Sequence, residues 1–436
     1  MQIKTQQTDG RQLFWLTILF LIPTYLQRVA NSGQGDSLGQ FDGVSLASAG
    51  YICNLLIILI GLFVIKSKLD FLHLLVLLAI FIFGLIQVSI SYSLYSTSFT
   101  GMAFAHLRAV IWVFCAYIFA AKIFEKDIFV DAFMKITVIF FCIVILSAAI
   151  YFTTGVPFGM VVGQGVERAH GLFSEPSVLG AIAPAFILIA LSKRDYVKVL
   201  IGLAALYFAN STTAYTTFVL VVAVQLLHRF PKLQIALVFL IVGAFAFIVV
   251  QLDLASSYYI ADVARSFSDT LDTWIGRSEF RAFTIDRLLN SIIDIPRFLR
   301  SGETEYSQDL GSLARLGGPR VMVNHMYNDG LYWFGYGLSV FAVVSLQIYR
   351  SVLDFGILPY FISCFGVGMG VLIVLFFTWS ISFWKKIDAR LFMIFVSALF
   401  GTLLNSAGGL SLYILVLLGA FSAVIYKSKQ HTHGDA

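Results

Sequence analysis

The chain has 436 residues, of which 59% are hydrophobic and only 12% are charged, and its mean hydropathy is +0.88. This composition excludes an ordinary soluble globular protein. The formal net charge is +5, its distribution is more informative than its size, and no nucleic-acid partner is expected. The composition predicts a polytopic membrane protein whose immediate partner is the lipid bilayer.

The apolar stretches predict about twelve membrane-spanning helices, because one span needs about 20 mostly apolar residues. Solid runs of Leu, Ile, Phe and Val favour helices over the alternating strands of a barrel. We place the helices at 13–29, 44–65, 69–93, 102–121, 133–153, 175–192, 196–210, 212–227, 233–252, 356–382, 390–406 and 409–426. The predicted fold is therefore an all-α polytopic membrane protein with a large outer loop that contains amphipathic helices.

This pattern divides the chain into three parts. Residues 1–252 hold roughly nine helices and a short outer loop at 153–175, and residues 356–436 hold the last helices and a tail. Between them, 253–355 form the large loop. It is rich in Tyr, Phe and Leu, so we expect it to fold on the membrane surface instead of remaining disordered.

The connections between the predicted helices fall into two alternating sets, and lysine occurs in only one of them. Positive residues near helix ends mark the cytoplasmic side, and this places both termini in the cytoplasm. The opposite connections contain arginine but no lysine. This preference suggests bidentate contacts with phosphate or carboxylate, although selection against outer lysine is an alternative. These outer arginines are Arg28, Arg108, Arg168, Arg265, Arg277, Arg281, Arg287, Arg297, Arg300, Arg315, Arg320 and Arg350.

Two polar groups are expected at the outer mouths of helices. In "RAHGLFSEPSVLG", Arg168 and Glu175 precede the helix predicted at 175–192. Glu175 could act as a base, or it could cap that helix through its first-turn amides, with Pro176 at an early helical position. Arg108, in "GMAFAHLRAVIW", either snorkels to the headgroups or faces an outward-open cavity.

The large loop carries a pair of arginines on one predicted helix. "GRSEFRAFTIDRLLNSIIDIP" shows an apolar helical stripe that Pro296 should end. Arg277 and Arg281 are four residues apart and so share one face, which suits a diphosphate. The alternative is a solvated network in which Glu279, Asp286 and Asp294 neutralise these arginines.

Further along the loop, His325 is expected in a polar loop, where it is either structural or a base. Residues 331–348 are apolar, and we predict that they form a helix in or near the outer leaflet. The glycines of "GVGMG", 366–370, are better explained by helix packing than by nucleotide binding.

We expect no metal and no cofactor. The sequence has neither a P-loop nor an HExxH motif, and its nearest paired-carboxylate motif is the ExE formed by Glu303 and Glu305.

Three motifs carry a resemblance to a known family. They are "RAHGLFSEPSVLG", "RSEFRAF", and "NHMYNDGLYWFG" followed by "DFGILPYF". With the layout of the whole chain, they resemble the bacterial O-antigen and exopolysaccharide polymerases and the related O-antigen ligases. In this chain Asn324 precedes His325, whereas the family's asparagine follows its histidine.

The resemblance implies a GT-C-like, metal-independent membrane glycosyltransferase. It would join undecaprenyl-diphosphate-linked oligosaccharide repeat units at the periplasmic face of the inner membrane, beside a flippase and a chain-length regulator. Arg277 and Arg281 would bind the donor diphosphate, Arg168 and Arg108 would complete the clamp, and Glu175 and His325 are the candidate bases. The alternatives are a ligase that transfers glycan to lipid A core, and a lipid-linked oligosaccharide flippase.

Overall fold

The structure is a computed structural model of the chain. It describes residues 126–163, 166–173, 176–251, 254–275, 322–336, 357–404 and 410–434, with isolated positions at 14, 17, 18, 21, 78, 79, 81, 82, 84–86, 89, 113, 116, 117, 120, 289, 290, 292–294, 296 and 297.

The described part is mostly helical, as the sequence predicts. The isolated positions within the predicted helices 13–29, 69–93 and 102–121 are all helical as well. The long helices are α5 (Lys126–Thr154), α6 (Pro176–Ser192), α7 (Tyr196–Ala209), α8 (Thr212–Leu226), α9 (Pro231–Gln251), α10 (Leu254–Ile275), α15 (Ile357–Ile387), α16 (Ala389–Leu404) and α17 (Leu410–Gly434).

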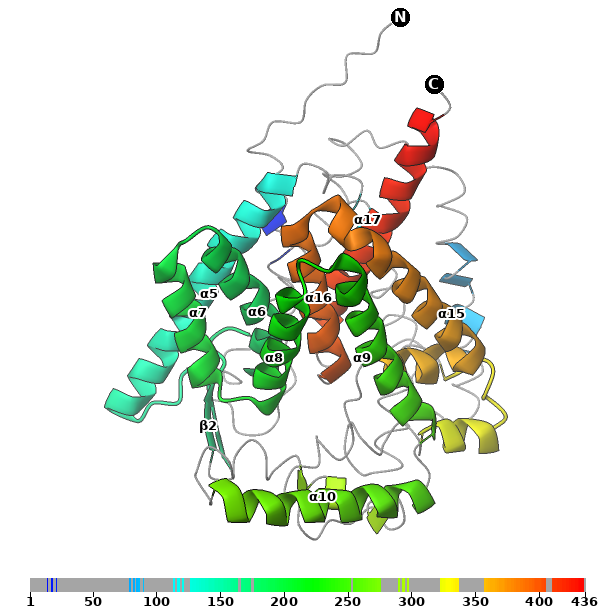
Figure 1. The fold of residues 1–436 in the computed structure, drawn as a ribbon, viewed down its shortest axis with the longest axis horizontal. Helices are drawn as coiled ribbons and strands as arrows, with labels where there is room; N and C mark the ends of the chain where they lie inside the picture. The colour runs from blue at the N-terminus through cyan, green and yellow to red at the C-terminus, as the bar shows by residue number, and fades with distance from the viewer. Residues whose placement is uncertain are drawn as a thin grey trace, which may run out of the picture.

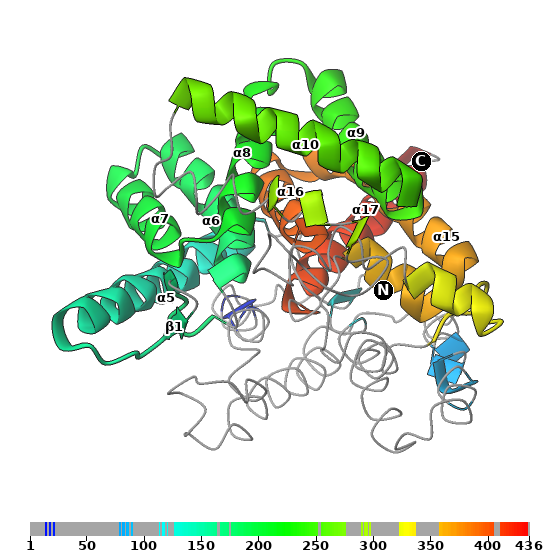
Figure 2. The same cartoon turned by 90° about the horizontal axis from the view of Figure 1, so that it is seen from below.

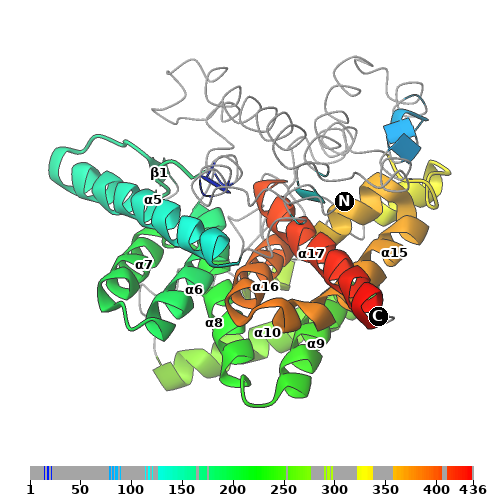
Figure 3. The same ribbon diagram turned by 90° about the horizontal axis from the view of Figure 1, so that it is seen from above.

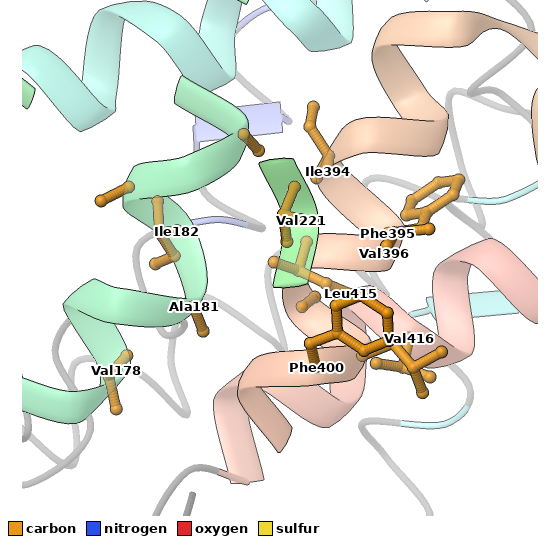
Figure 4. Close-up of a cluster of buried hydrophobic side chains, with 14 of the residues drawn as sticks. Val178, Ala181, Ile182, Val221, Ile394, Phe395, Val396, Phe400, Leu415 and Val416 are labelled. Atoms are coloured by element: carbon orange, nitrogen blue, oxygen red, sulfur yellow. The ribbon is translucent and has the colours of Figure 1, made fainter. Parts of the chain in front are cut away.

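The helices form a bundle of two groups that meet at its centre. Helices α5, α6 and α7 pack together on one side, and α15, α16 and α17 pack together on the other (Figures 1 and 3). The groups are joined where α16 packs against α6 and α8. The buried cluster in Figure 4 lies at this junction, with Ile182 of α6, Val221 of α8 and Phe400 of α16 among its members.

Small residues allow α6 to lie close to both of its main neighbours. A Cβ atom added to Gly180 would lie 2.1 Å from Cα of Ala214 in α8. On the other side, a Cβ atom at Gly401 of α16 would lie 2.0 Å from Cβ of Ala181. The hydroxyl of Ser397 also donates a hydrogen bond to the Ala181 carbonyl over 2.7 Å. Close backbone approach and an interhelical hydrogen bond are the usual means of joining helices in membranes.

Polar caps set the short turns between helices. The Asp195 side chain accepts from the backbone N–H of Lys198 and caps the start of α7. Asn210 ends α7 in the left-handed conformation, with φ of 41°. Asp388 accepts from the backbone N–H of Arg390 over 2.6 Å and so caps α16. The two aspartates satisfy backbone N–H groups at the helix starts, and the left-handed residue ends its helix, so the chain reverses direction at these points.

Basic residues of the connections gather at one end of the bundle. Lys385, at the end of α15, donates to the backbone carbonyl of His228 and to Gln234 at the start of α9. Lys193, after α6, pairs with Asp131 near the start of α5 over 3.0 Å. Figure 1 shows these connections at the end where the C-terminus lies, whereas β2 and α10 lie at the opposite end.

A short β-hairpin follows α5, so the prediction of an all-α fold is wrong here. Strands β1 (Met160–Gly163) and β2 (Val166–Ala169) are antiparallel, and Gly163 pairs with Val166. Two residues separate these ends, which is the commonest hairpin connection. The strands have only four residues each, so they show too little alternation to be recognised in the sequence.

Helix α10 lies across the end of the bundle (Figures 1 and 2). Its residues Ala264 and Leu271 pack with Leu289 and Ile293 in a small cluster separate from the main core. Ile292 packs against both clusters, so this helical stretch links α10 to the bundle.

One prediction about this outer segment has a clear outcome. The described positions of 289–294 are helical, as expected. Pro296 and Arg297 are helical too, but residue 295 lies outside the described residues, so the end of the helical stretch at Pro296 stays a prediction.

Helix α15 is interrupted at Gly366, so the continuous helix predicted at 356–382 is wrong at this point. Gly366 has φ of 79° and ψ of 167°. The carbonyl of Ser363 accepts from the N–H of Tyr336 over 2.8 Å, and the N–H of Val367 donates to the carbonyl of Tyr332 over 2.9 Å. In a regular helix Ser363 and Val367 would bond to each other.

Residues 331–336 supply both replacement partners, and they form turns. The prediction of a helix from residue 331 is therefore wrong for its described part. A Cβ atom at Gly366 would lie 2.1 Å from the Trp333 carbonyl oxygen, and one at Gly335 would lie 2.4 Å from the Gly366 nitrogen. The close contact with α15 therefore needs glycine on both sides, and helical backbone at 331–336 would not supply these hydrogen bonds.

Two described helices are long and apolar enough to cross a membrane, namely Ile128–Thr154 within α5 and Gly370–Ile387 within α15. Large apolar side chains are also exposed along α7, among them Leu200, Leu203 and Tyr207. Exposed apolar surface of this kind suits contact with lipid.

Candidate functional site

Arg168 and its neighbour Glu167, whose side chain attaches the hairpin to α5, lie on opposite faces of the hairpin. Neighbouring side chains of a strand point to opposite faces. Glu167 accepts a hydrogen bond from the Tyr151 hydroxyl of α5 over 2.7 Å, and Ala169 is buried, so both lie on the face toward the bundle. Arg168 lies between them in β2 and is half-buried. Its side chain therefore leaves the strand on the other face of the hairpin.

A tight turn after β2 fixes the hairpin against α5. The N–H groups of His170 and Gly171 both donate to the carbonyl of Gly159, over 2.9 and 3.0 Å. Gly171 has φ of +59°, and a Cβ atom there would lie 3.0 Å from Cγ2 of Val144 in α5. Glycine is needed here for both the left-handed backbone and the close contact with α5.

His170 is held within this turn. It is buried, and its Nδ1 atom lies 2.8 Å from the carbonyl oxygen of Phe173. A carbonyl can only accept, so Nδ1 carries the proton in this hydrogen bond. His170 thus stabilises the turn that orients the hairpin.

Aromatic packing then leads the chain into α6. The ring of Phe173 lies 5.5 Å from Phe140 and 6.0 Å from Phe141 of α5, and Phe141 lies 5.0 Å from Phe186 of α6. Pro176 is the first residue of α6, which confirms its predicted early helical position. Glu175 directly precedes it in the sequence but lies outside the described residues.

His325 lies in a helical stretch whose described residues are 322–328, not in a loop as predicted. Met322 and Met326 are one helical turn apart and fully buried, so they fix this helix against the main core. His325 is half-buried beside them, and the described part of the chain offers its imidazole no hydrogen-bond partner. Asp329, just after the helix, accepts from the Tyr336 hydroxyl over 2.7 Å.

The structure does not bring the hairpin and this helix together. Figures 1 and 2 both show β1 and β2 on one side of the molecule, beside α5 and α7, and residues 322–328, in yellow, on the other side, beside α15. Of the predicted site residues, Arg168 and His325 therefore occupy separate places. Glu175, Arg108, Arg277 and Arg281 lie outside the described residues.

Among the described residues, the two ends of the bundle differ in whether lysine is among their basic side chains. At the end with the hairpin and α10, the basic residues of those elements are Arg168 and Arg265, and Arg265 pairs with Asp262 over 3.2 Å. The other end carries Lys193, Lys198 and Lys385. This placement matches the predicted division of arginine and lysine between the connections.

Sequence reasoning missed the Tyr151–Glu167 pair and the role of His170. The two partners of the pair are 16 residues apart, and only the reversal at Gly155 and Gly159, both with positive φ, brings them together. A short segment with Gly155, Pro157 and Gly159 was the available signal of that reversal. Within the described ranges, no group of three His, Cys, Asp or Glu side chains could hold a metal ion.

Comparisons with known proteins add no family to this description. No family model matches the chain, and neither a curated protein nor a solved structure matches it significantly.

Proposed function

We propose that this chain is a multi-pass membrane glycosyltransferase that polymerises undecaprenyl-diphosphate-linked oligosaccharide repeat units at the periplasmic face of the bacterial inner membrane. The observation that carries the proposal is the position of Arg168. It lies on a hairpin fixed to α5, at the end of the bundle that also bears α10 and opposite the lysine-rich connections. With lysines toward the cytoplasm, this end faces outward.

The reaction breaks the bond between the anomeric carbon of the donor glycan and its diphosphate oxygen. A hydroxyl oxygen of the acceptor repeat unit forms the new glycosidic bond to that carbon, and its proton passes to a base. The departing lipid diphosphate gains negative charge, so positioned cations that bind it lower the barrier. Guanidinium groups suit this task because they bind phosphate oxygens through two parallel hydrogen bonds.

In this proposal Arg277 and Arg281 bind the donor diphosphate, and Arg168 and Arg108 complete the clamp. The distance between the hairpin and residues 322–328 in the fold favours Glu175 over His325 as a base that acts beside Arg168. Glu175 immediately precedes Pro176 at the start of α6, and the turn before it is fixed by Phe173. The proposed partners in the cell are a flippase that delivers the repeat units and a chain-length regulator.

The surface polysaccharide of a strain that lacks the gene tests this function. We expect single repeat units on lipid A core in the deletion strain and a ladder of chain lengths after complementation with the wild type. Arg281→Ala and Arg281→Lys should both fail to restore the ladder, since a lysine cannot form the bidentate contact.

The matched control is Arg265→Lys, which changes an exposed arginine of the same outer segment that is paired with Asp262. It should restore the ladder, and all variants should reach wild-type amounts in the membrane. Bare core with long chains held on the lipid carrier would instead identify a ligase. A lack of repeat units at the outer face would identify a flippase.

A further inference from the structure

We propose that Trp333 and Phe334 form a lipid-contact surface at the outer boundary of the membrane, continuous with an exposed apolar stripe on α15. The inference requires that the bundle lies in a membrane, but it does not depend on glycosyl transfer. It rests on the interruption of α15 at Gly366 and on the side chains that surround it.

The first step is the exposure of the two aromatic rings. Trp333 is 65% exposed and Phe334 is 56% exposed, although the backbone of this segment is closely packed on α15. The hydrogen bonds of Tyr332 and Tyr336 to either side of the interruption hold the segment in place. The rings are therefore presented outward by a fixed backbone, which is the arrangement of an anchor for an apolar or interfacial partner.

The second step is the position of the Trp333 ring over α15. A Cβ atom at Gly368 would lie 3.5 Å from Cε3 of Trp333, which is van der Waals distance. Gly368 begins a helical row that continues with the exposed residues Val371, Leu372 and Leu375. Residues three, four and seven positions apart share one face of a helix, so Trp333 lies at the top of this stripe.

The third step is the length of the stripe. Trp379 lies on the same face eleven positions after Gly368, about 16 Å along the helix axis at 1.5 Å per residue. Lys386 lies about 27 Å from Gly368 on the same measure, close to the roughly 30 Å thickness of the hydrocarbon layer. The stripe thus spans from a tryptophan at one boundary to lysines at the other, as expected for a helix placed between two interfaces.

Lipid is favoured over a glycan or a protein as the partner because the aromatic surface is continuous with the apolar stripe. Trp333 and Phe334 then lie among the headgroups and the upper acyl chains.

Depth-dependent fluorescence quenching tests this placement. The full chain is reconstituted into nanodiscs of phosphatidylcholine whose acyl chains carry bromine either near the headgroup or near the chain ends. The signals of single tryptophans are obtained as the difference between the wild type and Trp333→Phe, Trp379→Phe or Trp384→Phe. Each variant removes one of the six tryptophans, and size-exclusion profiles and helix content confirm that it folds.

We expect the Trp333 signal to lose more intensity with bromine near the headgroup, and the Trp379 signal to lose more with bromine near the chain ends. Trp384 is fully buried and should respond to neither. The inference is overturned if Trp333 responds to acrylamide in water but not to brominated lipid, which would make its ring a site for a soluble glycan or protein. It is also overturned if the deep bromine quenches Trp333 more strongly. If neither Trp333 nor Trp379 responds to any quencher in the lipid, the premise that the bundle lies in a membrane is contradicted, and the inference is overturned with it.

Discussion

Gly401 of α16 and Ala181 of α6 are packed so closely that the added Cβ atom of an alanine at position 401 would lie 2.0 Å from the methyl group of Ala181. This contact joins the two halves of the bundle, because α16 belongs to one group of helices and α6 to the other. Ser397, one turn earlier in α16, donates its hydroxyl proton to the Ala181 carbonyl. The junction therefore depends on small side chains at these two positions.

Replacing Gly401 with alanine should separate these helices. We expect the Gly401→Ala variant to lose about 1–3 kcal/mol of stability, the usual cost of overpacking, and to show a lower Tm in detergent. Adding Ala181→Gly should recover part of the loss, because it removes the methyl group that the new Cβ atom meets. The control is Gly243→Ala in α9, where no atom lies within 4 Å of the added Cβ. Equal losses in both single variants would contradict the contact.

The interruption of α15 predicts a specific effect of Gly366→Ala. The new side chain would meet the Trp333 carbonyl and would also have to adopt φ of +79°, so residues 331–336 should detach. Hydrogen exchange at the Tyr336 amide should then become faster. Gly330→Ala is the matched control, since its φ is +72° but no atom lies near the added Cβ. The Gly330→Ala variant should lose only about 1–3 kcal/mol of stability through backbone strain, and its Tyr336 amide should stay protected from exchange.

The cap of α16 predicts a pH dependence of stability. Burial alone would raise the pKa of Asp388, but its hydrogen bonds with Arg390 outweigh burial and hold the pKa below the ordinary value of 3.8. A carboxyl with a lowered folded pKa stabilises the fold when it is ionised. The stabilisation is complete above the ordinary value and is lost as the pH falls through the lower folded value.

Unfolding of the wild type and Asp388→Asn should therefore be compared between about pH 6 and about pH 3. Asparagine keeps the cap but not the charge, so the difference between the two proteins should shrink at low pH. Asp388→Ala should cost about 1 kcal/mol through the lost cap. A difference that stays constant over the whole range would show that the Asp388 charge adds nothing.

The hairpin predicts different outcomes for two neighbouring residues. Arg168→Ala and Arg168→Lys should both abolish the polysaccharide ladder if, as proposed, Arg168 binds the donor diphosphate through two hydrogen bonds. Glu167→Gln should keep it, since Glu167 faces α5 and its amide oxygen can still accept from the Tyr151 hydroxyl. The ladder is resolved by gel electrophoresis, with protein amounts checked by immunoblot. A ladder from Arg168→Lys would show that charge alone suffices at this position.

Among the described residues, the helices predicted between 133 and 252 and between 356 and 426 overlap α5–α9 and α15–α17, because each of these predictions rests on an apolar stretch. Helix α10 is less apolar and was not predicted at its bounds. The turn around Asn210 and Ser211 separates α7 from α8 where polar residues interrupt that stretch, and α6 begins at Pro176, one residue from the predicted start. These boundaries depend on local chemistry, so they can be read without tertiary contacts.

The hairpin and the break at Gly366 could not be predicted in the same way. The turn after β2 depends on the carbonyl of Gly159, and the break depends on Tyr332 and Tyr336, which lie about 30 residues earlier in the chain. A run of glycines in an apolar helix is equally compatible with close helix packing. Only the distant backbone partners distinguish the two cases.

The order of these partners along the chain also bears on how the protein is made. The backbone groups of Ser363 and Val367 bond to Tyr336 and Tyr332, which a ribosome synthesises before it reaches α15. The segment that accepts the broken helix is therefore already present when α15 emerges. The part that remains apolar and unbroken, Gly370–Ile387, is long enough to insert alone. Biosynthesis can thus proceed without a stage in which a continuous helix must later be broken inside the bilayer.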